Sequence, residues 1–520
     1  MSENLVRQRF FEALAFLVRA GCKIPFSRRI PLDLTTSTLA SNPIVPRIWI
    51  GLLSLLPLAT SAQNLLGLTT SPNGGIHRAY QNPAWLADSP HRYYLSFGAV
   101  NIHANNNFLR YKAPFSLLRF VTGQVTDRYR RTNGGVQFED SYTEEIQDGK
   151  PKNGTVWGEF RGPALQVAVG ERTVIGLSSR LRASAQVWGA SEQLLSALRA
   201  SLNSDVFYSI PSRNNAFSAN ANTYAEVAAS LGHTLFEDES SSLMVGFTAK
   251  YLVGFTSGYF VNEGLTYEIL PDPLVQSRGY MNVKEIAGQF GYTTYLQNRN
   301  LSLRSLVNGN PPGRGVGFDA GLAYRIQADT DGPTLKAGIA VTDVGSIRYK
   351  GDAYKIDERN LRLVSEDFNE VRNSEQIVGV IREKLRVDPS RNIGAFNSGL
   401  PTSLNLNVDY QQPSGIGLQV AYWQDLRGNS AVAMHQPSVL AVVPRYDNRL
   451  LGAALPVSYV NGAAQVGLSV RVGPAWAGSD NIFGLLGTSN NGFAVRGIDI
   501  YFGLAMGFGS RTATDNDNDY

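Results

Sequence analysis

The sequence predicts an all-β fold, a closed transmembrane antiparallel β-barrel of about 14 strands. Three observations predict it. From residue 91 onward, apolar and polar residues alternate with a period of two, over runs longer than the ~5–6 residues of an average soluble strand. Short turns alternate with long connecting segments. Charged residues make up 17% of the 520 residues and Gly contributes 51, a composition typical of a lipid-facing β surface.

The alternation is clearest at 173–188 and at 242–257. Their apolar faces are Ile175, Leu177, Leu181, Ala183, Ala185 and Val187, and Leu243, Val245, Phe247, Ala249, Tyr251, Val253 and Phe255. We expect these faces to contact lipid. A cation such as Arg should be tolerated better on the opposite faces, for example at Gly246 or Ser178, because those faces line the lumen of the barrel.

Turn lengths set the topology of the barrel. Short turns are predicted at 170–172, 237–240, 329–333, 412–415 and 446–448. Long segments are predicted at 104–154, 189–222, 258–315 and 350–401. One short side and one long side are typical of the periplasmic turns and extracellular loops of outer-membrane proteins. We therefore predict a barrel in the outer membrane of a Gram-negative bacterium, with lipid as its main partner.

The strand count follows from parity. Both termini should be periplasmic, which requires an even number of strands. Thirteen runs alternate, and the segment 478–487, with Ile482, Phe483, Leu485 and Leu486, is predicted as the fourteenth strand. Barrels of 12 or 16 strands are the alternatives. The barrel is predicted to span 91–509.

Two of the long segments carry helical patterns. In 360–385, apolar residues recur at helical spacing, and this predicts one or two amphipathic helices within an extracellular loop. They are Leu361, Val364, Phe368, Val371, Ile377 and Ile381. A second short helix is predicted at 191–200. These helices either cap the barrel or gate a ligand.

The first 62 residues read as an export region. Arg47 precedes the apolar run 48–59, and small residues follow, which predicts a signal peptide cleaved after Ala62. Residues 1–46 are unusual for a signal peptide, and we interpret them as the result of a start codon placed too far upstream. The only cysteine, Cys22, lies in this region, so the exported chain has neither disulfides nor thiolate sites. The opposite terminus, 510–520, is an acidic tail that we expect to be disordered.

Charge and motifs exclude several functions. Residues 1–62 carry seven basic and three acidic residues, which equals the +4 net charge of the whole chain; the exported part is therefore neutral and no nucleic-acid partner is expected. No histidine has metal-ligand spacing, and there is no phosphate-binding or dinucleotide-binding loop. We expect no enzymatic activity, catalytic residue, metal or cofactor.

The segment 63–90 does not alternate. Its motif Asn82-Pro83-Ala84, followed by Trp85 and Leu86, predicts an ordered turn with apolar residues that need a packing surface. About eight strands is the limit at which wall side chains alone fill a barrel. We therefore predict that 63–90 folds into the lumen as a hatch; an extended periplasmic lead-in is the alternative.

Charged residues on the polar faces of the strands are candidates for the lumen. They are Arg180, Arg182, Lys250, Asp319, Arg325 and Asp409. They either contact a transported molecule or form an interior network of ion pairs.

The motif Asn82-Pro83-Ala84 resembles the NPA motif of FadL-type transporters, outer-membrane channels for long-chain fatty acids and other hydrophobic compounds. Longer stretches resemble a FadL-like family of Bacteroidetes-type outer-membrane proteins known as a domain of unknown function. They are QNLLGLTTS (63–71), YQNPAWLADS (80–89), NNNFLRYKAPFSLL (105–118), GEFRGPAL (158–165), AVTDVGSIRYKG (340–351), LPTSLNLNVDYQ (400–411), VPRYDNRLLGAALPVSY (443–459) and VRVGPAWAGSDNIFGLLG (470–487).

This resemblance implies 14 strands, an N-terminal hatch and long third and fourth extracellular loops. The third and fourth long segments, 258–315 and 350–401, are the two longest. The implied function is passive uptake of a small hydrophobic compound across the outer membrane. The alternative is a non-transport barrel that anchors surface proteins or belongs to a secretion machinery, with surface or periplasmic proteins as partners.

Overall fold

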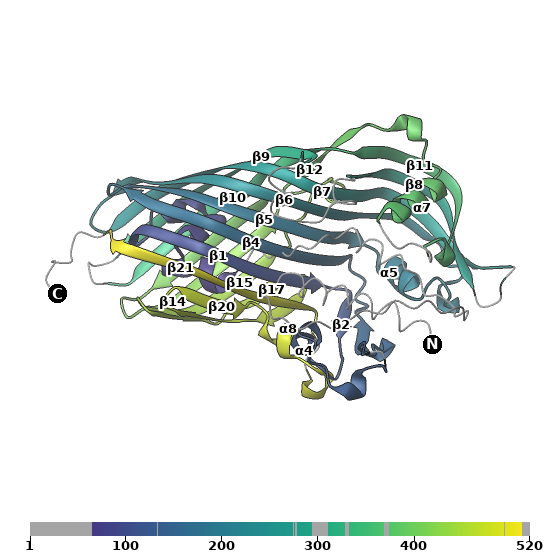
Figure 1. Ribbon diagram of the computed structural model, residues 1–520, viewed down its shortest axis with the longest axis horizontal. Coiled ribbons are helices and arrows are strands. Elements are labelled where there is room, and N and C mark those ends of the chain that lie inside the picture. The colour runs from purple at the N-terminus through teal and green to yellow at the C-terminus, as the bar shows by residue number, and fades with distance from the viewer. Residues whose placement is uncertain are drawn as a thin grey trace, which may run out of the picture.

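The protein is an antiparallel β-barrel with extracellular extensions (Figure 1). In the computed structural model the described residues are 65–132, 134–273, 275, 278–293, 310–327, 332–368, 374–492 and 495–511. The predicted cleavage after Ala62 and the segment 512–520 of the predicted tail lie outside these residues. Within them, none of the helices is long and apolar enough to cross a bilayer.

The barrel wall has 14 strands, as predicted. It closes because β1 pairs with both β4 and β21. The wall strands are β1 (His91–Asn106), β4 (Lys152–Val169), β5 (Thr173–Ala190), β6 (Ser212–Glu237), β7 (Ser241–Pro271), β9 (Gly313–Gln327), β10 (Thr334–Lys350), β12 (Ala395–Gly399) continuing as β13 (Ser403–Gln411), β14 (Ile416–Asp425), β15 (Val439–Asp447), β16 (Leu451–Ala454) continuing as β17 (Val457–Val460), β18 (Ala463–Val466) continuing as β19 (Leu468–Val472), β20 (Ala475–Ser479) and β21 (Gly497–Ser510).

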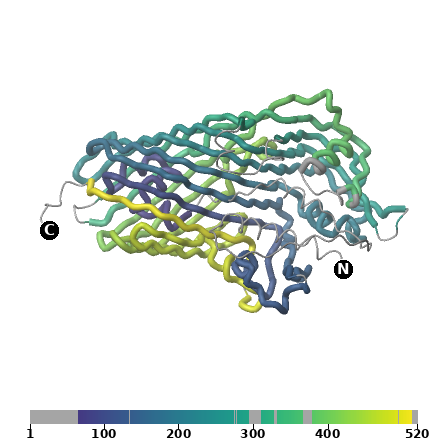
Figure 2. Tube along the Cα trace, viewed as in Figure 1, coloured from purple at the N-terminus to yellow at the C-terminus, as the bar shows by residue number. Residues whose placement is uncertain are grey.

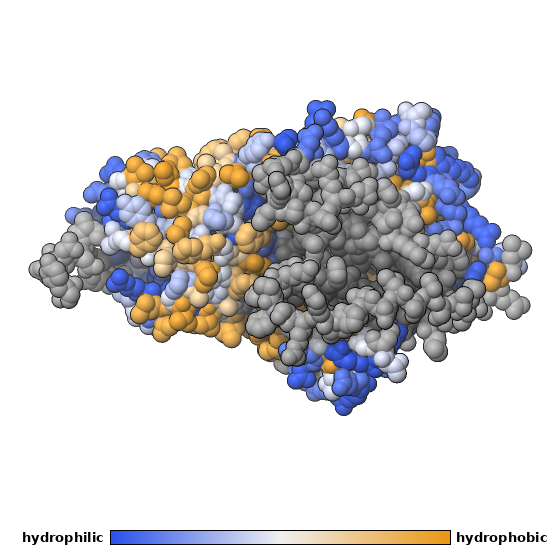
Figure 3. All heavy atoms as spheres, in the orientation of Figure 1, coloured by the Kyte–Doolittle hydropathy of each residue, from blue (hydrophilic) through white to orange (hydrophobic). Residues whose placement is uncertain are grey.

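The outer face of the wall is apolar. Leu177 is 58% exposed and Phe247 is 46% exposed, although both are large and apolar. Apolar side chains gather over the end of the barrel that carries the short turns, and polar side chains gather over the other end (Figure 3). An apolar surface of this kind needs lipid around it. The protein is an outer-membrane barrel.

One residue of the predicted lipid face is misplaced. Phe255 is 2% exposed. Tyr224 pairs with Gly254 and Thr223 pairs with Thr256, so Phe255 is an extra, unpaired residue in β7. This β-bulge reverses the alternation, and Phe255 turns away from lipid.

The two sides of the wall differ in height. The strands β4–β10, which we call the tall half, include β6 and β7 with 26 and 31 residues. The strands β13–β20, which we call the short half, include β13 and β14 with 9 and 10 residues. The upper part of β7 leaves the barrel and pairs with β8 (Gly279–Tyr292), which in turn pairs with β11 (Asp352–Val364).

This extracellular extension, which we call the cap, has its own apolar core. The helices α5 (Glu192–Arg199) and α7 (Ser374–Lys384) lie at this end of the molecule (Figure 1) and contribute buried side chains to the core. This confirms the helices predicted at 191–200 and in the second part of 360–385. The prediction of loop or helix for Leu361 and Val364 is wrong, because both residues lie in β11. Residues three apart in a strand lie on opposite faces; Leu361 is buried in the core of the cap, whereas Val364 is only partly buried.

The prediction of a strand at 478–487 is also wrong. The strand β20 ends at Ser479, and α8 (Ile482–Leu486) follows it. Asn481 starts the helix by accepting a hydrogen bond from the backbone N–H of Gly484 at 2.9 Å. Phe483 and Leu486 remain exposed, so α8 presents apolar side chains in the part of 478–487 that was predicted to continue the strand. The count still closes at 14, because 475–479 supplies the strand.

The remaining elements lie in the extracellular segments. A small lobe beside α8 contains β2 (Leu109–Tyr111), α4 (Leu117–Val121) and β3 (Thr143–Glu145) (Figure 1). The short 3-10 helices of all the extracellular segments are η3 (Asp127–Tyr129), η4 (Asp140–Tyr142), η5 (Asp205–Phe207), η6 (Ser365–Phe368), η7 (Pro389–Arg391) and η8 (Ser489–Asn491).

Candidate functional site

The segment that precedes the barrel lies inside it. Figure 2 shows this first described part of the chain within the barrel, toward the end that carries the short turns. It consists of α3 (Leu66–Thr69), η1 (Pro72–Tyr80) and η2 (Pro83–Leu86). Leu66, Asn82, Ala84 and Leu86 are completely buried, although they belong to no strand. We call residues 65–90 the hatch.

Asn82 fixes the hatch to the wall. Its side-chain oxygen accepts a hydrogen bond from the backbone N–H of Ala84 at 2.9 Å, which caps η2. Its side-chain nitrogen donates to the carbonyl oxygens of Leu322 at 3.0 Å and of Ile339 at 3.3 Å, on β9 and β10. Pro83 occupies the first position of η2, where its fixed φ and missing N–H are tolerated. The Asn82 amide therefore both caps η2 and fixes the hatch to β9 and β10.

The hatch rests on a row of glycines, which we call the glycine seat. The sequence pattern did not single these glycines out. Gly232, Gly246 and Gly321 face one another on β6, β7 and β9. A Cβ added to Gly246 would lie 2.1 Å from the backbone nitrogen of Ala84, and one added to Gly321 would lie 2.1 Å from the side-chain oxygen of Asn82. The expectation that Gly246 tolerates Arg is therefore wrong, because the backbone of the hatch lies directly on it.

Ion pairs hold the other end of the hatch. Asp88 accepts from Arg78 of the hatch at 3.1 Å and from Lys336 of β10 at 2.7 Å, and the Arg325 guanidinium lies 3.6 Å from it. Burial alone would raise the pKa of the Asp88 carboxyl, but Lys336 and Arg78 lower it to about 2. Arg325 also donates to Glu237 at 2.9 Å and is partly exposed near the periplasmic turns.

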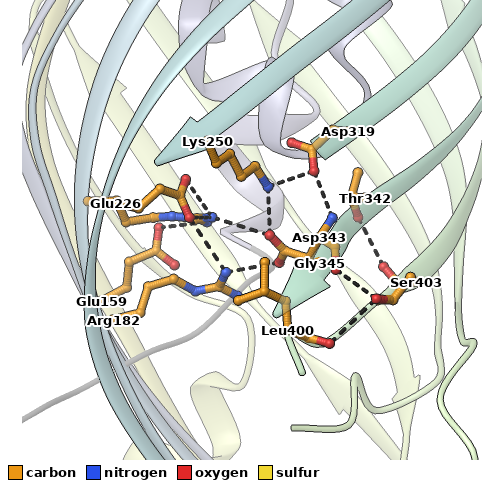
Figure 4. Close-up of polar contacts among 12 residues, drawn as sticks. Glu159, Arg182, Glu226, Lys250, Asp319, Thr342, Asp343, Gly345, Leu400 and Ser403 are labelled. Atoms are coloured by element: carbon orange, nitrogen blue, oxygen red, sulfur yellow. Dashed lines mark hydrogen bonds and ion pairs between the residues drawn. The ribbon is translucent and has the colours of Figure 1, made fainter. Parts of the chain in front are cut away.

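A belt of buried charges crosses the tall half on the extracellular side of the hatch, the direction that we call above (Figure 4). Arg180 donates to Glu226 at 2.8 Å, and Arg182 donates to Asp343 at 2.9 Å. Lys250 lies 2.6 Å from both Asp319 and Asp343. We call this set the charged belt; its members are Glu159, Arg161, Arg180, Arg182, Glu226, Lys250, Asp319 and Asp343. It holds as many cations as carboxylates, so each buried charge has an opposite partner.

Asp343 is the member that alternation misplaces. The register between β9 and β10 shifts between Val341 and Val344, and Asp343 has a φ of 55°. The parity of β10 would place this side chain toward lipid, but the bulge turns it into the lumen. Its backbone N–H donates to Asp319 at 2.7 Å. A non-glycine residue at positive φ is held there by its surroundings, here by the belt.

The hatch reaches the belt through Tyr80 and His77. The Tyr80 ring centroid lies 4.3 Å from the Arg161 guanidinium carbon and 4.5 Å from that of Arg180. Burial, and then the charge of Arg161, lower the pKa of His77, so its ring is neutral near pH 7. A cavity beside Tyr80, Arg180 and Lys250 measures only about 20 Å³, room for a water molecule. Protein side chains close the lumen at this height.

The short half lines the lumen differently. Several of its inward side chains form an apolar cluster around Leu66 of the hatch. They are Ala421, Trp423, Val439, Ala441, Val443, Ala454 and Val460. Asp409 lies on this side, where it pairs with Arg445 at 2.7 Å and both are buried. Of the six lumen candidates, Arg180, Arg182, Lys250 and Asp319 meet in the belt, whereas Arg325 and Asp409 have separate partners.

Comparison with known proteins gives a family. Residues 83–480 match a family of unknown function, DUF5723. The chain belongs to this family. None of the curated proteins compared with the chain matches it. Among the described residues, no three His, Cys, Asp or Glu side chains are arranged to hold a metal ion.

Several solved structures are similar at low identity. The toluene transporter TbuX of Ralstonia pickettii is 11% identical with a TM-score of 0.38, over 87% of this chain and 99% of that one. The TodX deltaS2S3 mutant monoaromatic hydrocarbon channel is 12% identical with a TM-score of 0.39, over 87% and 100%. A Pseudomonas aeruginosa FadL homologue is 11% identical with a TM-score of 0.26, over 87% and 99%.

Proposed function

We propose that this family member is a gated channel for passive uptake of a small hydrophobic compound across the outer membrane. The observation that carries the proposal is that the lumen is filled by a separate segment, the hatch. Hydrogen bonds from Asn82, ion pairs of Asp88 and packing of Leu66 hold it. A plug held by such contacts is able to shift without breaking the wall.

The side chains that line the lumen above the belt support the proposal that the transported compound is hydrophobic. Its buried aromatic side chains include Tyr224, Tyr259, Tyr349 and Phe396, packed with Leu400. The Phe396 ring centroid lies 5.0 Å from that of Tyr259 and 5.6 Å from that of Tyr349. A compound that enters from outside meets these apolar rings before it meets the charged belt.

The cap favours a second candidate function, the binding of a protein at the cell surface. Its core is the largest cluster of buried apolar residues in the described part of the chain. A transport loop has no need of a core of this size, whereas a surface anchor or a component of a secretion machinery needs a rigid platform. Copurification of a protein with the full chain, lost when 258–292 is replaced by a short loop, would support this alternative.

Replacing Gly246 with Val tests the gate. The new side chain would collide with the backbone of Pro83 and Ala84, so the hatch should leave its seat and conductance in planar bilayers should rise severalfold. Gly258→Val is the matched control on the same strand, because a Cβ there meets only the Gly291 carbonyl oxygen at 3.9 Å. A folded, heat-modifiable Gly246→Val barrel whose conductance equals that of Gly258→Val would overturn the proposal.

A further inference from the structure

We propose that the lumen above the charged belt contains a binding site for a neutral ligand with a flat apolar ring and uncharged hydrogen-bonding groups, such as hydroxyl, carbonyl or amide. This inference rests on the proposed uptake function and narrows its substrate class. It excludes plain hydrocarbons and carboxylates as preferred ligands.

A row of neutral side chains crosses β1 and the neighbouring strands of the tall half at this height. Consecutive strands β1, β4, β5, β6 and β7 place these residues opposite one another and bury them toward the lumen. They are Asn105, Thr155, Gln186, Asn220 and Tyr259. The row contains amides, a hydroxyl and a phenol, and no charge. It lies beyond the belt in the extracellular direction, since β5 reaches Gln186 after Arg180 and Arg182.

The loop between β14 and β15 turns back into the lumen onto this row. The backbone N–H of His435 donates to the Gln186 side-chain oxygen at 2.8 Å, and the His435 carbonyl accepts from the Gln186 side-chain nitrogen at 2.9 Å. The His435 ring stacks on Trp188 with centroids 4.8 Å apart and an angle of 5°. The same loop bonds the opposite wall, where the Gly399 N–H donates to Val432 at 2.9 Å.

Besides Asn105 Nδ2 at the β1 end of the row, four polar atoms on β6 and on this loop are buried and lack a hydrogen-bond partner. They are Ser218 Oγ, Asn220 Nδ2, His435 Nε2 and Gln436 Oε1. Their residues are 0%, 6%, 0% and 1% exposed. Ser218 and Asn220 lie opposite Trp188 and Gln186, the two residues that hold His435. A buried polar group without a hydrogen bond destabilises the folded state, and folded proteins rarely leave several in one place.

These atoms define the chemistry of the ligand. They include a donor, Asn220 Nδ2, and an acceptor, Gln436 Oε1, and the Ser218 hydroxyl can act as either. The neutral His435 ring adds an acceptor at Nε2, because its Nδ1 donates to the Asp425 carboxylate at 2.7 Å, so the ligand must offer both kinds of hydrogen bond. Ser218, Asn220 and Gln436 carry no charge, Asp425 already lies beside His435, and the cations of the belt are paired within it, so a carboxylate finds no free cation in the belt. Tyr259, Phe396 and Trp188 supply flat apolar surfaces for a ring. A hydrocarbon would occupy the rings but would leave the four atoms unpaired.

Three probes that share a benzene ring separate the classes: benzamide, toluene and benzoate. Quenching of tryptophan fluorescence in the purified full chain should saturate with benzamide at a concentration at least tenfold lower than with toluene or benzoate. The saturable part should shrink in Trp188→Phe, because Trp188 lies in the layer. Equal affinities for benzamide and toluene, or a preference for benzoate, would overturn the inference.

Asn220→Leu keeps the number and branching of the side-chain heavy atoms and removes an amide whose nitrogen has no partner. We expect its unfolding temperature to be unchanged or higher, while benzamide affinity falls at least tenfold. Asn222→Leu on the same strand and face is the control: Asn222 donates to Ser398 Oγ at 3.0 Å and accepts from the Tyr349 hydroxyl, so its loss should lower the unfolding temperature.

If Asn220→Leu lowers stability as much as Asn222→Leu does, or leaves benzamide affinity unchanged, the site is structural and the inference fails. This failure is distinct from failure of the channel proposal, because binding is measured in detergent and gating is measured with Gly246→Val. Raised conductance without benzamide preference would refute only the ligand class. Benzamide binding without any effect of Gly246→Val would refute only the gate.

Discussion

The tall and short halves of the wall have similar lipid faces, and their lumen faces differ in how many charges they bury. Leu177 in the tall half and Leu440 in the short half are both about half exposed to lipid. Behind them, the tall half carries the charged belt and the glycine seat, whereas the short half carries small apolar residues such as Ala441. A period of two shows that a strand has two faces, but it does not show which chemistry lines the lumen.

The hatch uses this difference. It meets the tall half through hydrogen bonds of Asn82 and ion pairs of Asp88. It meets the short half through packing of Leu66 and through uncharged hydrogen bonds of Gln81 with Gln419 and Asn405. Polar contacts fix its orientation, because they have defined directions. Apolar contacts add affinity without direction. If this division is correct, variants on the two sides should differ in kind as well as in size.

The largest effect is expected in the belt. Lys250→Met leaves Asp319 buried without its cation, and breaking a buried pair in this way costs about 3–5 kcal/mol. We expect a loss of this size in the free energy of unfolding, measured by urea titration of the barrel in lipid vesicles. Adding Asp319→Asn should recover more than half of it, because the amide oxygen still accepts from the Asp343 N–H.

An exposed pair in the cap is the control for the belt. Arg359 and Glu285 lie 3.2 Å apart with side chains 70% and 51% exposed, and exposed pairs contribute less than about 1 kcal/mol. Arg359→Met should therefore change little. A similar loss for Lys250→Met and Arg359→Met would mean that water reaches the belt, and that the tall half is not a dry charged wall.

On the apolar side, Leu66→Ala should cost about 3 kcal/mol, since truncating a fully buried leucine removes its contacts and leaves a cavity. The loss falls on docking of the hatch, so we expect brief openings in single-channel recordings, while the wall keeps its urea midpoint. Asn73→Ala, at an exposed contact of the hatch with Asn448, should show no openings. A shifted urea midpoint without openings would assign Leu66 to the stability of the wall.

Sequence reasoning predicted what repeats and missed what interrupts. Periodicity found the wall, and parity found 14 strands, because both depend on patterns that many residues share. The helix α8 was not predicted, because Ile482 and Phe483 are as apolar as the residues of a strand. Only the hydrogen bond that Asn481 accepts from Gly484 marks the start of the helix. The strands of the cap escaped for the opposite reason. Their exposed face, with residues such as Lys284 and Arg359, resembles that of a loop.

The site was predicted in part for the same physical reason. Arg180, Arg182 and Lys250 stand out as charges within apolar strands, which a sequence displays directly. Asp343 depends on a bulge, and Gly246 depends on a backbone that approaches from residue 84. Both depend on contacts distant in sequence. The recurrence of glycine at one height on three neighbouring strands was a usable signal once the register was known. Cleavage after Ala62 stays a prediction.

The smallest effect expected is a response of the hatch to pH through Asp88. Burial raises the pKa of this carboxyl, but Lys336 and Arg78 lower it to about 2, below the ordinary value of 3.8. A lowered pKa in the folded protein stabilises the docked hatch above pH ~4, and this contribution, about 2 kcal/mol, is lost as the pH falls toward 2. His77 does not add a response near pH 6, since burial and Arg161 keep its pKa well below 6.5.

Conductance should therefore stay low from pH 8 to pH 5 and rise only below pH ~3. Asp88→Asn should weaken docking at pH 7 by about the same 2 kcal/mol and abolish the rise at low pH, because the amide neither titrates nor attracts Lys336. Asp127→Asn, at an exposed carboxylate of the extracellular lobe, should leave the profile unchanged. Opening with a midpoint near pH 6 that persists in Asp88→Asn would show that another titrating group controls docking of the hatch. The ion pairs of Asp88 with the tall half would then not be the contacts that hold the hatch closed.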